Sequence, residues 1–203
     1  PFIFRDWDHL EHVLKSPVAE RLADIILAKT GIRTLGWMQQ GFRVTLTVKR
    51  QINDIKDFEG LKIRLPEEAT LVRTFQLVKA RPTVVPWGEV YTSLQTGVVD
   101  GMESTPTAIY SMKFFEVAYY LAETNHQHGV VQMLIGEKVF GSLSAANQEI
   151  VRQAARETMG VNYQEARGEA RKAFELLRGK VRQTTMPDLR PFREACLLYT
   201  SPS

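Results

Sequence analysis

The sequence contains a single cysteine, Cys196, among 203 residues. One cysteine cannot form an internal disulfide, so the cysteine content does not report the redox compartment. No run of about 18 apolar residues occurs, and the sequence pattern therefore predicts no membrane-spanning helix. The motifs GxSxG, GxGxxG and HExxH and the P-loop are absent as well, which argues against the enzyme classes that they mark.

The sequence also lacks a strong excess of charge of one sign. The 26 Lys and Arg residues are scattered among 23 Asp and Glu residues, for a net charge of +3 and a pI near 9.1. This balance predicts no nucleic-acid surface and is compatible with a small anionic ligand. Hydrophobic residues make up 44% of the chain, the composition of a globular protein with a core. The first residues, PFIFRDWDHL, lack an initiator Met and a signal-peptide pattern, so we expect that any targeting segment is not part of this sequence.

Helical and strand patterns alternate along the chain, which favours an α/β fold. Residues 42–48, FRVTLTV, alternate like a half-buried strand. A long amphipathic pattern runs from residue 144 to 178 and predicts one long helix. The remaining predicted helices cover residues 8–29, where Pro17 must begin or break a turn, and residues 67–80, 89–96 and 106–121. The remaining strands cover residues 30–38, 61–65, 81–86, 98–101 and 130–136.

Polar and aromatic residues stand where three predicted strands end. Arg64 ends one strand, Trp87 follows another, and Ser104 follows a third. In α/β proteins ligands bind beyond the carboxyl ends of the strands, so these side chains could line one cleft. A guanidinium suits a carboxylate because its planar fork offers two parallel N–H donors. Trp87 could shield that pair from water, and Ser104 could add a neutral hydrogen bond.

Each feature has a purely structural alternative. Arg64 could be a solvated surface residue on the polar face of its strand, Trp87 could belong to the core, and residues 98–101 could be a buried strand with its turn. His126 and His128 could in principle bind a metal together, but a surface turn is the favoured interpretation because no carboxylate or cysteine cluster accompanies them. We therefore predict no metal, no cofactor and no catalytic residue.

Several longer segments resemble a known family. The stretches DFEGLKIRLP, PTVVPWGEVYTSLQTGVVDGMES, IYSMKFFEVAYYL and TNH, in this order and spacing, are similar to the solute-binding proteins of tripartite ATP-independent periplasmic (TRAP) transporters. The resemblance extends from the first residues to about residue 191, and the segment 86–101 is its most specific part.

The resemblance implies a fold and a function. It implies an α/β, type II periplasmic-binding-protein-like fold with two lobes and a long helix that spans both, and an N-terminal segment that this sequence lacks. It further implies a periplasmic, monomeric protein that captures an organic acid through a carboxylate and delivers it to a TRAP permease, without enzymatic activity. The lobes implied are residues 1–41 and 130–169 for lobe I and residues 42–129 and 170–195 for lobe II, followed by a non-native tail at residues 196–203.

The resemblance also assigns ligand-binding roles. The family's signature arginine corresponds to Arg64, and a second anion-contacting arginine corresponds to Arg43. The aromatic residue that lines the cleft, often Phe, corresponds to Trp87. Ser104 stands where several members have Asn, which leaves the identity of the acid open.

Two other function classes stay open at this point. A periplasmic sensor domain could use the same fold to signal instead of to transport. A small-molecule enzyme on an α/β fold is the third alternative. Downstream signalling domains would favour the sensor, whereas neighbouring permease genes would favour transport.

Overall fold

The computed structural model describes residues 1–186 and 188–200, and for residues 197–200 it describes the backbone only. Contacts between Cα atoms divide the chain into two compact units. Unit 1 comprises Pro1–Ile3, Phe42–His128 and the chain from Ala170 onward, and unit 2 comprises Phe4–Gly41 and Gly129–Glu169. In the part of the chain that the structure describes, no helix has the length and apolar character needed to cross a membrane.

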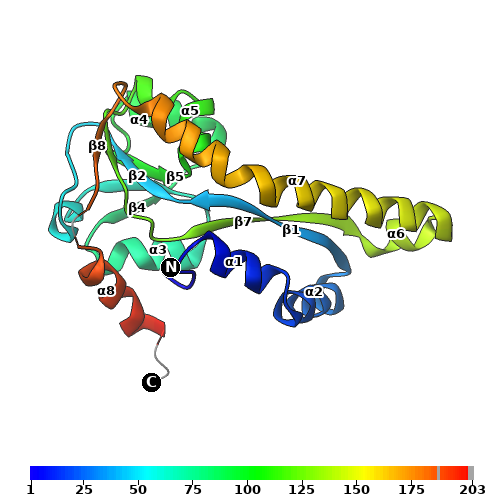
Figure 1. Cartoon of the computed structure of the whole chain (residues 1–203). Coiled ribbons are helices and arrows are strands. Elements are labelled where there is room, and N and C mark those ends of the chain that lie inside the picture. Colours follow the sequence, from blue (N-terminus) through cyan, green and yellow to red (C-terminus); the bar gives the residue numbers. More distant parts are fainter. Residues whose placement is uncertain (187, 201–203) are drawn as a thin grey trace. The chain divides into compact units, whose positions relative to one another are not determined.

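Unit 1 is built on a six-stranded sheet with the strand order β4-β3-β5-β2-β6-β8. Figure 1 labels β2, β4, β5 and β8 of this sheet. Its strands are β2 (Val44–Thr47), β3 (Lys62–Leu65), β4 (Arg81–Val84), β5 (Gly101–Ser104), β6 (Tyr120–Ala122) and β8 (Arg182–Thr184). Strand β3 is parallel to β4 and β5, and β6 is parallel to β8, whereas β2 is antiparallel to β5 and β6. The amino end of β2 and the carboxyl ends of the other five strands therefore lie along one edge, which we call the carboxyl edge.

Helices cover both faces of this sheet. One core cluster contains Val44 and Leu46 of β2 and the buried side chains of α4 (Val90–Gln95) and α5 (Pro106–Ser111). A second cluster contains Ile63 and Leu65 of β3 and buried side chains of α3 (Ala69–Leu77) and α8 (Arg190–Thr200). Neighbouring side chains of a strand point to opposite faces. The sheet is therefore the middle layer of three.

Short 3-10 helices connect these elements. They are η1 (Ile55–Phe58), η2 (Trp87–Glu89) and η3 (Phe114–Glu116). Helix α5 begins at Pro106, whose fixed φ suits the first helical position, and the side chain of Thr105 accepts a hydrogen bond from the Ala108 N–H.

Unit 2 contains a two-stranded sheet formed by β1 (Ile32–Phe42) and β7 (His128–Gly136). Its helices are α1 (Trp7–Leu14), α2 (Pro17–Thr30), α6 (Glu137–Ser142) and the first part of α7 (Ala145–Leu177). Asn162 of α7 accepts from the Gln39 N–H at 2.7 Å and donates to the Gln39 carbonyl at 3.0 Å, and the Tyr163 hydroxyl donates to the Trp37 carbonyl at 2.8 Å. These hydrogen bonds hold α7 on β1.

The sequence pattern predicted some elements correctly. The long helix expected over residues 144–178 is confirmed as α7, and the strand that ends before Pro66 is confirmed as β3. The half-buried pattern of residues 42–48 was wrong, because all four residues of β2 are buried. Strand β2 lies inside the sheet between β5 and β6, and helices cover both of its faces.

Two predicted elements are wrong. The helix expected over residues 106–121 ends at Ser111, because Lys113 adopts a left-handed backbone with φ of 55°, and the chain then forms η3 and β6. The strand expected over residues 98–101 begins only at its last residue, Gly101. Asp100 precedes the strand and is held by Lys62. The Asp100 N–H donates to the Lys62 carbonyl at 2.8 Å, and the Asp100 carboxylate accepts from the Lys62 N–H at 2.9 Å.

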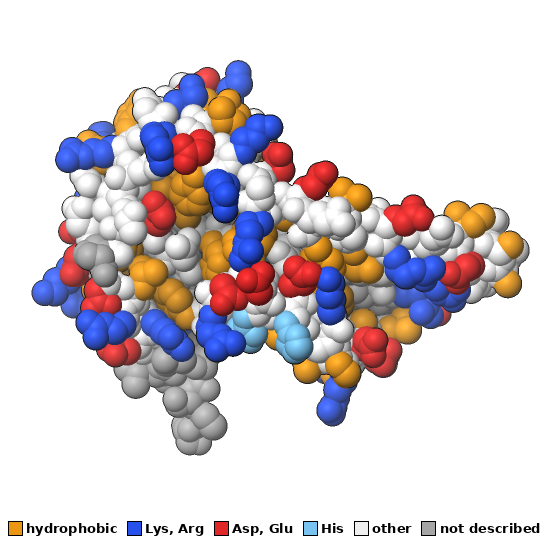
Figure 2. Space-filling model, viewed as in Figure 1, with side chains coloured by type: hydrophobic (Ala, Val, Ile, Leu, Met, Phe, Trp, Pro, Cys, Tyr) orange, Lys and Arg blue, Asp and Glu red, His pale blue; other side chains and the backbone are white. Residues whose placement is uncertain are grey.

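The surface carries both charges. Figure 2 shows acidic and basic side chains interspersed on the visible face. Part of the predicted tail, residues 201–203, lies outside the described residues. Within the tail, Cys196 is buried in α8 and belongs to the second core cluster of unit 1.

Candidate anion-binding site

The carboxyl edge of unit 1 brings the predicted site residues together. Arg43 directly precedes β2, whose first residue, Val44, pairs with Ser104 at the end of β5. Arg64 lies near the end of β3, opposite Met102 of β5. The parallel pairing of β3 with β5 and the antiparallel pairing of β2 with β5 therefore place Arg43, Arg64 and Ser104 along the same edge.

Arg64 is a buried cation, and among the residues that the structure describes only its Nε has a hydrogen-bond acceptor. Its side chain is 3% exposed, and its Nε donates to the Val85 carbonyl at 2.9 Å. Among the described residues, none accepts a hydrogen bond from its two Nη groups. Burial lowers the pKa of Arg64, Glu103 opposes this effect, and Arg43 adds to it. Because a guanidinium stays protonated in proteins, Arg64 presents a positive charge that has no partner of opposite sign in direct contact within the described part of the chain.

Trp87 lies against this guanidinium. The Cζ atom of Arg64 is 5.4 Å from the centre of the Trp87 ring, within the range of a cation–π interaction. Trp87 also meets Phe114 edge-on, with ring centres 5.3 Å apart. It is 39% exposed, so the alternative that Trp87 is a core residue is wrong. The alternative that Arg64 is a solvated surface residue is wrong as well, because β4 and β5 flank its strand.

Arg43 already has an anionic partner. Its Nε and Nη2 contact the two carboxylate oxygens of Glu103, with an Nη2–Oε1 distance of 2.8 Å. The Arg43 side chain is 14% exposed and that of Glu103 is fully buried. Burial lowers the pKa of Arg43, but the hydrogen bond and charge of Glu103 outweigh burial and raise it. Arg43 is therefore half of a buried ion pair.

Glu103 is a site residue that the sequence analysis missed. Its Oε2 lies 3.3 Å from Nε2 of His126, and His126 Nδ1 lies 2.8 Å from the Thr124 hydroxyl. Burial raises the pKa of Glu103, but Arg43 and His126 outweigh it and lower the pKa to about 2. Burial lowers the pKa of His126. Glu103 is therefore ionised and His126 neutral at pH 7.

The hydrogen-bond partners define the tautomer of His126. An ionised carboxylate only accepts hydrogen bonds, so we assign the ring proton to Nε2, which donates to Glu103. Nδ1 then accepts from the Thr124 hydroxyl, whose oxygen is 3.3 Å from the Thr45 hydroxyl. One signal for this network was present in the sequence: Arg43, Thr45 and Thr47 are polar at alternate positions of an apolar strand.

The two histidines are not on a surface turn, since His126 is 0% and His128 4% exposed. No group of three His, Cys, Asp or Glu residues able to hold a metal occurs among the residues that the structure describes.

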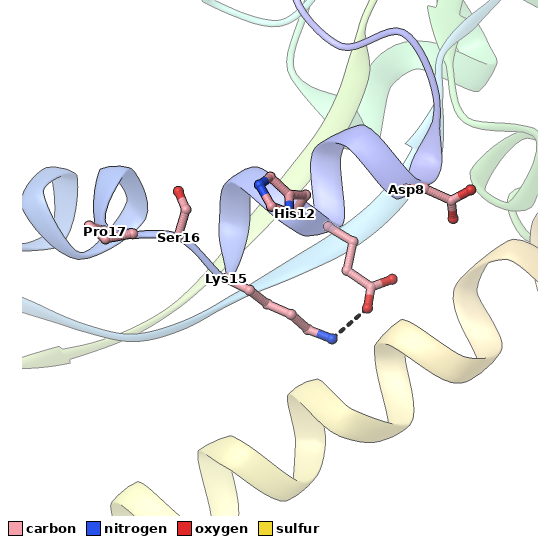
Figure 3. A pocket seen from close by; sticks show the side chains of 6 residues that line it. Asp8, His12, Lys15, Ser16 and Pro17 are labelled. Carbon is pink, nitrogen blue, oxygen red and sulfur yellow. Dashed lines mark hydrogen bonds and ion pairs between the residues drawn. The ribbon is translucent and has the colours of Figure 1, made fainter.

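A separate hollow of about 570 Å³ lies in unit 2 at α1 and the start of α2 (Figure 3). Its cation, Lys15, points to Glu11 and forms an ion pair of 2.5 Å with it. The Lys15 ammonium also lies 4.7 Å from the centre of the Tyr163 ring. Lys15 is paired with Glu11 and exposed, so it is a weaker candidate for binding an anion than the buried Arg64 is. The lining residues are Asp8, Glu11, His12, Lys15, Ser16 and Pro17.

The comparison with known families relates this arrangement to other proteins. Residues 1–200 match the family described as bacterial extracellular solute-binding protein, family 7. The chain belongs to this family. Membership confirms the resemblance to TRAP solute-binding proteins that the segments around Arg64 and Trp87 indicated.

Two relatives of known name are similar to most of this chain. The sialic acid-binding periplasmic protein SiaP of Vibrio cholerae is 33% identical over 195 residues, which are 96% of this chain and 60% of SiaP. The 2,3-diketo-L-gulonate-binding periplasmic protein YiaO of Escherichia coli is 31% identical over 164 residues, which are 81% of this chain and 49% of YiaO. The chain thus spans about half to three fifths of the length of these two relatives.

Solved structures confirm the α/β two-lobed fold class. A TRAP periplasmic solute-binding protein from a Sulfitobacter species with bound β-D-galacturonate has a TM-score of 0.94 and 26% identity, covering 98% of this chain and 67% of that protein. A sugar acid-binding protein from Advenella mimigardefordensis in complex with galactonate has a TM-score of 0.94 and 27% identity. The match covers 98% of this chain and 65% of that protein.

Proposed function

We propose that this family 7 chain is part of a periplasmic solute-binding protein that captures an organic acid and delivers it to a TRAP permease. It binds the ligand without a chemical step and works as a monomer, without nucleic acid. The lobes are those expected from the sequence, with residues 42–129 and 170–195 forming the lobe that carries the arginines.

The single observation that carries this proposal is the state of Arg64. A guanidinium that is 3% exposed and has two unpaired Nη groups is costly unless an anion satisfies it. A ligand carboxylate can accept hydrogen bonds from both Nη groups, and a hydrogen bond to a charged group is worth about 1.5–3 kcal/mol. Arg64 is therefore the main ligand residue of the proposed site.

The other proposed ligand residues assist Arg64. Trp87 covers the guanidinium on one side and is exposed enough to meet a ligand. Ser104 ends β5 at the same edge and can offer a hydroxyl to the ligand. Arg43 holds Glu103 through Nε and Nη2, which leaves its Nη1 for a ligand.

A thermal-shift screen tests this function. The full-length gene product that contains this chain is melted with a panel of sugar acids, hydroxy acids, keto acids and aromatic acids. A ligand at about 100 times its Kd adds about 2.7 kcal/mol of stability, so at least one acid should raise the Tm by several degrees. NMR of the released ligand should show it chemically unchanged. If no acid raises the Tm, the proposed function is wrong.

Two arginine variants make the screen specific. Arg64→Gln removes the positive charge of the guanidinium and should abolish the rise in Tm that the acid causes. Arg156→Gln is the matched control, because Arg156 lies on α7 of unit 2 with its side chain 57% exposed. The control should respond like the parent. An Arg64→Gln protein that keeps the full shift would show that the acid binds elsewhere.

A further inference from the structure

The six-stranded sheet of unit 1 has a second edge opposite the carboxyl edge, which we call the amino edge. It is formed by the amino ends of β3, β4, β5, β6 and β8 and by the carboxyl end of β2. Five exposed cations lie at the first residues of these strands or two residues away from a strand end: Lys49, Lys62, Lys180, Arg81 and Arg182. None of them is part of the proposed ligand site at the carboxyl edge.

Backbone hydrogen bonds hold the amino edge as one continuous row. Arg81 of β4 is paired with Lys62 of β3, and the Lys62 carbonyl accepts from the Asp100 N–H at 2.8 Å. The Asp100 carbonyl in turn accepts from the loop after β2 at 2.9 Å. On the other side of β2, the Tyr119 N–H donates to the end of β2 at 2.9 Å, and the Arg182 N–H donates to the Tyr119 carbonyl at 2.7 Å. Since adjacent strands lie about 4.8 Å apart, this row extends over roughly 24 Å.

The acids near the amino edge differ from the five cations in their partners. Each acid accepts a hydrogen bond or forms an ion pair within unit 1, and these acids are Asp54, Asp57, Glu59, Asp100, Glu116 and Glu175. None of the five cations forms an ion pair with a residue that the structure describes. Lys62 and Arg81 even repel each other, because they occupy directly paired positions. The five cations are therefore available to anions outside the chain.

Exposed apolar and aromatic side chains stand among these cations. Tyr119, between β2 and β8 in the row, is 50% exposed, and Val98, two residues before Asp100, is 53% exposed. The Lys180 ammonium lies 4.9 Å from the centre of the Phe115 ring. Lys and Arg side chains beside exposed aromatic and aliphatic groups are typical of protein surfaces that lie on anionic lipid headgroups. A bilayer also offers many anions at once, which matches a row of cations better than a single small anion does.

We propose that the amino edge of unit 1 is a docking surface for a bilayer that contains anionic phospholipids. The five cations contact phosphate groups of the lipids, and Tyr119 and Val98 contact the boundary between headgroups and acyl chains. The inference goes beyond the proposed function, which concerns the carboxyl edge alone. Its consequence is a higher concentration of the protein at the membrane surface, where a permease can receive the ligand.

Sedimentation with lipid vesicles tests the docking surface. The full-length gene product is mixed, without any acid ligand, with vesicles of phosphatidylcholine alone or of phosphatidylglycerol with phosphatidylcholine. We expect binding only to the anionic vesicles, and we expect salt to weaken it, because the screening length falls from about 30 Å at 0.01 M to about 8 Å at 0.15 M. Equal binding to both kinds of vesicle, or no binding to the anionic ones at low salt, overturns the inference. Binding to polyglutamate without binding to vesicles would assign the edge to an acidic protein and would overturn it as well.

A triple variant tests which cations bind the lipid. It combines Lys62→Gln, Arg81→Gln and Arg182→Gln, which remove three cations of the row. Each Lys or Arg near an anionic membrane contributes about fivefold to binding, so the triple variant should bind the anionic vesicles on the order of 100-fold more weakly at low salt. An unchanged affinity would show that the amino edge does not meet the membrane.

A second triple variant with the same net charge is the matched control. It combines Arg21→Gln, Lys29→Gln and Lys138→Gln, all at exposed positions of unit 2. This protein should bind the vesicles nearly as well as the parent, and an equal loss in both triple variants would show that net charge alone causes binding. Melting curves show that both variants fold. Both should keep the rise in Tm that an acid ligand causes, so the test of the amino edge stays separate from the test of the proposed function.

Discussion

The guanidinium of Arg43 and the carboxylate of Glu103 form a two-point ion pair across 60 residues of sequence, and the Glu103 side chain is 0% exposed. Removing one partner of a buried pair leaves an uncompensated charge and costs about 3–5 kcal/mol. The pair therefore both shapes the proposed site and determines how unit 1 responds to acid.

Acid should destabilise unit 1 through Glu103. Its pKa is about 2 in the folded state against an ordinary value of 4.5, so the unfolded state binds the proton more readily. The stability from this group is fully present above about pH 4.5 and is lost as the pH falls towards 2, on the order of 3 kcal/mol in total. His126, whose pKa is also lowered, adds a loss in the same direction that begins below its ordinary value of 6.5. Urea unfolding at pH 7, 5.5, 4.5 and 3 measures this dependence.

Glu103→Gln is the control for the acid response. The variant should be less stable at pH 7, and its stability should fall less steeply between pH 4.5 and pH 3 than that of the parent. Parallel curves for the two proteins in this range would show that other carboxylates cause the acid response.

Gly101→Ala should destabilise the central sheet. A Cβ atom at Gly101 would lie 2.7 Å from the carbonyl oxygen of Leu46, a backbone atom of the paired strand β2. The strands would have to move apart, at a cost of about 1–3 kcal/mol. Gly160→Ala is the contrast, because nothing lies within 4 Å of the added atom and Ala favours a helix over Gly by about 1 kcal/mol. Chemical unfolding should show a loss of stability for Gly101→Ala and a gain for Gly160→Ala. Equal losses in the two variants would contradict this account.

Phe192→Ala should cost about 3–5 kcal/mol. Phe192 of α8 is 0% exposed and packs with Phe58, Phe75 and Phe2, at ring-centre distances of 5.6, 6.1 and 5.3 Å. Phe192→Leu keeps most of the volume and should cost clearly less. If the Ala variant melts like the parent, α8 does not contribute to the core of unit 1.

Asn162→Ala should weaken unit 2. The change removes two hydrogen bonds to the Gln39 backbone and leaves a partly buried N–H and C=O without their partner, which costs about 1–3 kcal/mol. Asn147→Ala is the control on the same helix, since Asn147 is exposed. Hydrogen exchange at the Gln39 amide should accelerate in the first variant only. Unchanged exchange in Asn162→Ala would contradict the proposed clamp of α7 on β1.

Local sequence patterns determined the elements that depend on neighbouring residues. The apolar stripe after residue 144 specifies α7, Pro66 ends β3, and Thr105 with Pro106 starts α5. Such signals act within a few residues, through helical spacing, fixed φ angles and caps, so they can be read without the fold. The segments around Arg64 and Trp87 were also sufficient to indicate the family.

Only the tertiary structure decided the state of the charged residues. A period-2 pattern places Arg64 on the polar face of β3, but burial on both faces of the sheet makes it 3% exposed. Likewise, nothing in the spacing of Arg43 and Glu103 indicates that they form a pair. The antiparallel register that pairs Val44 with Ser104 brings them together, and a register is a long-range property of the whole sheet.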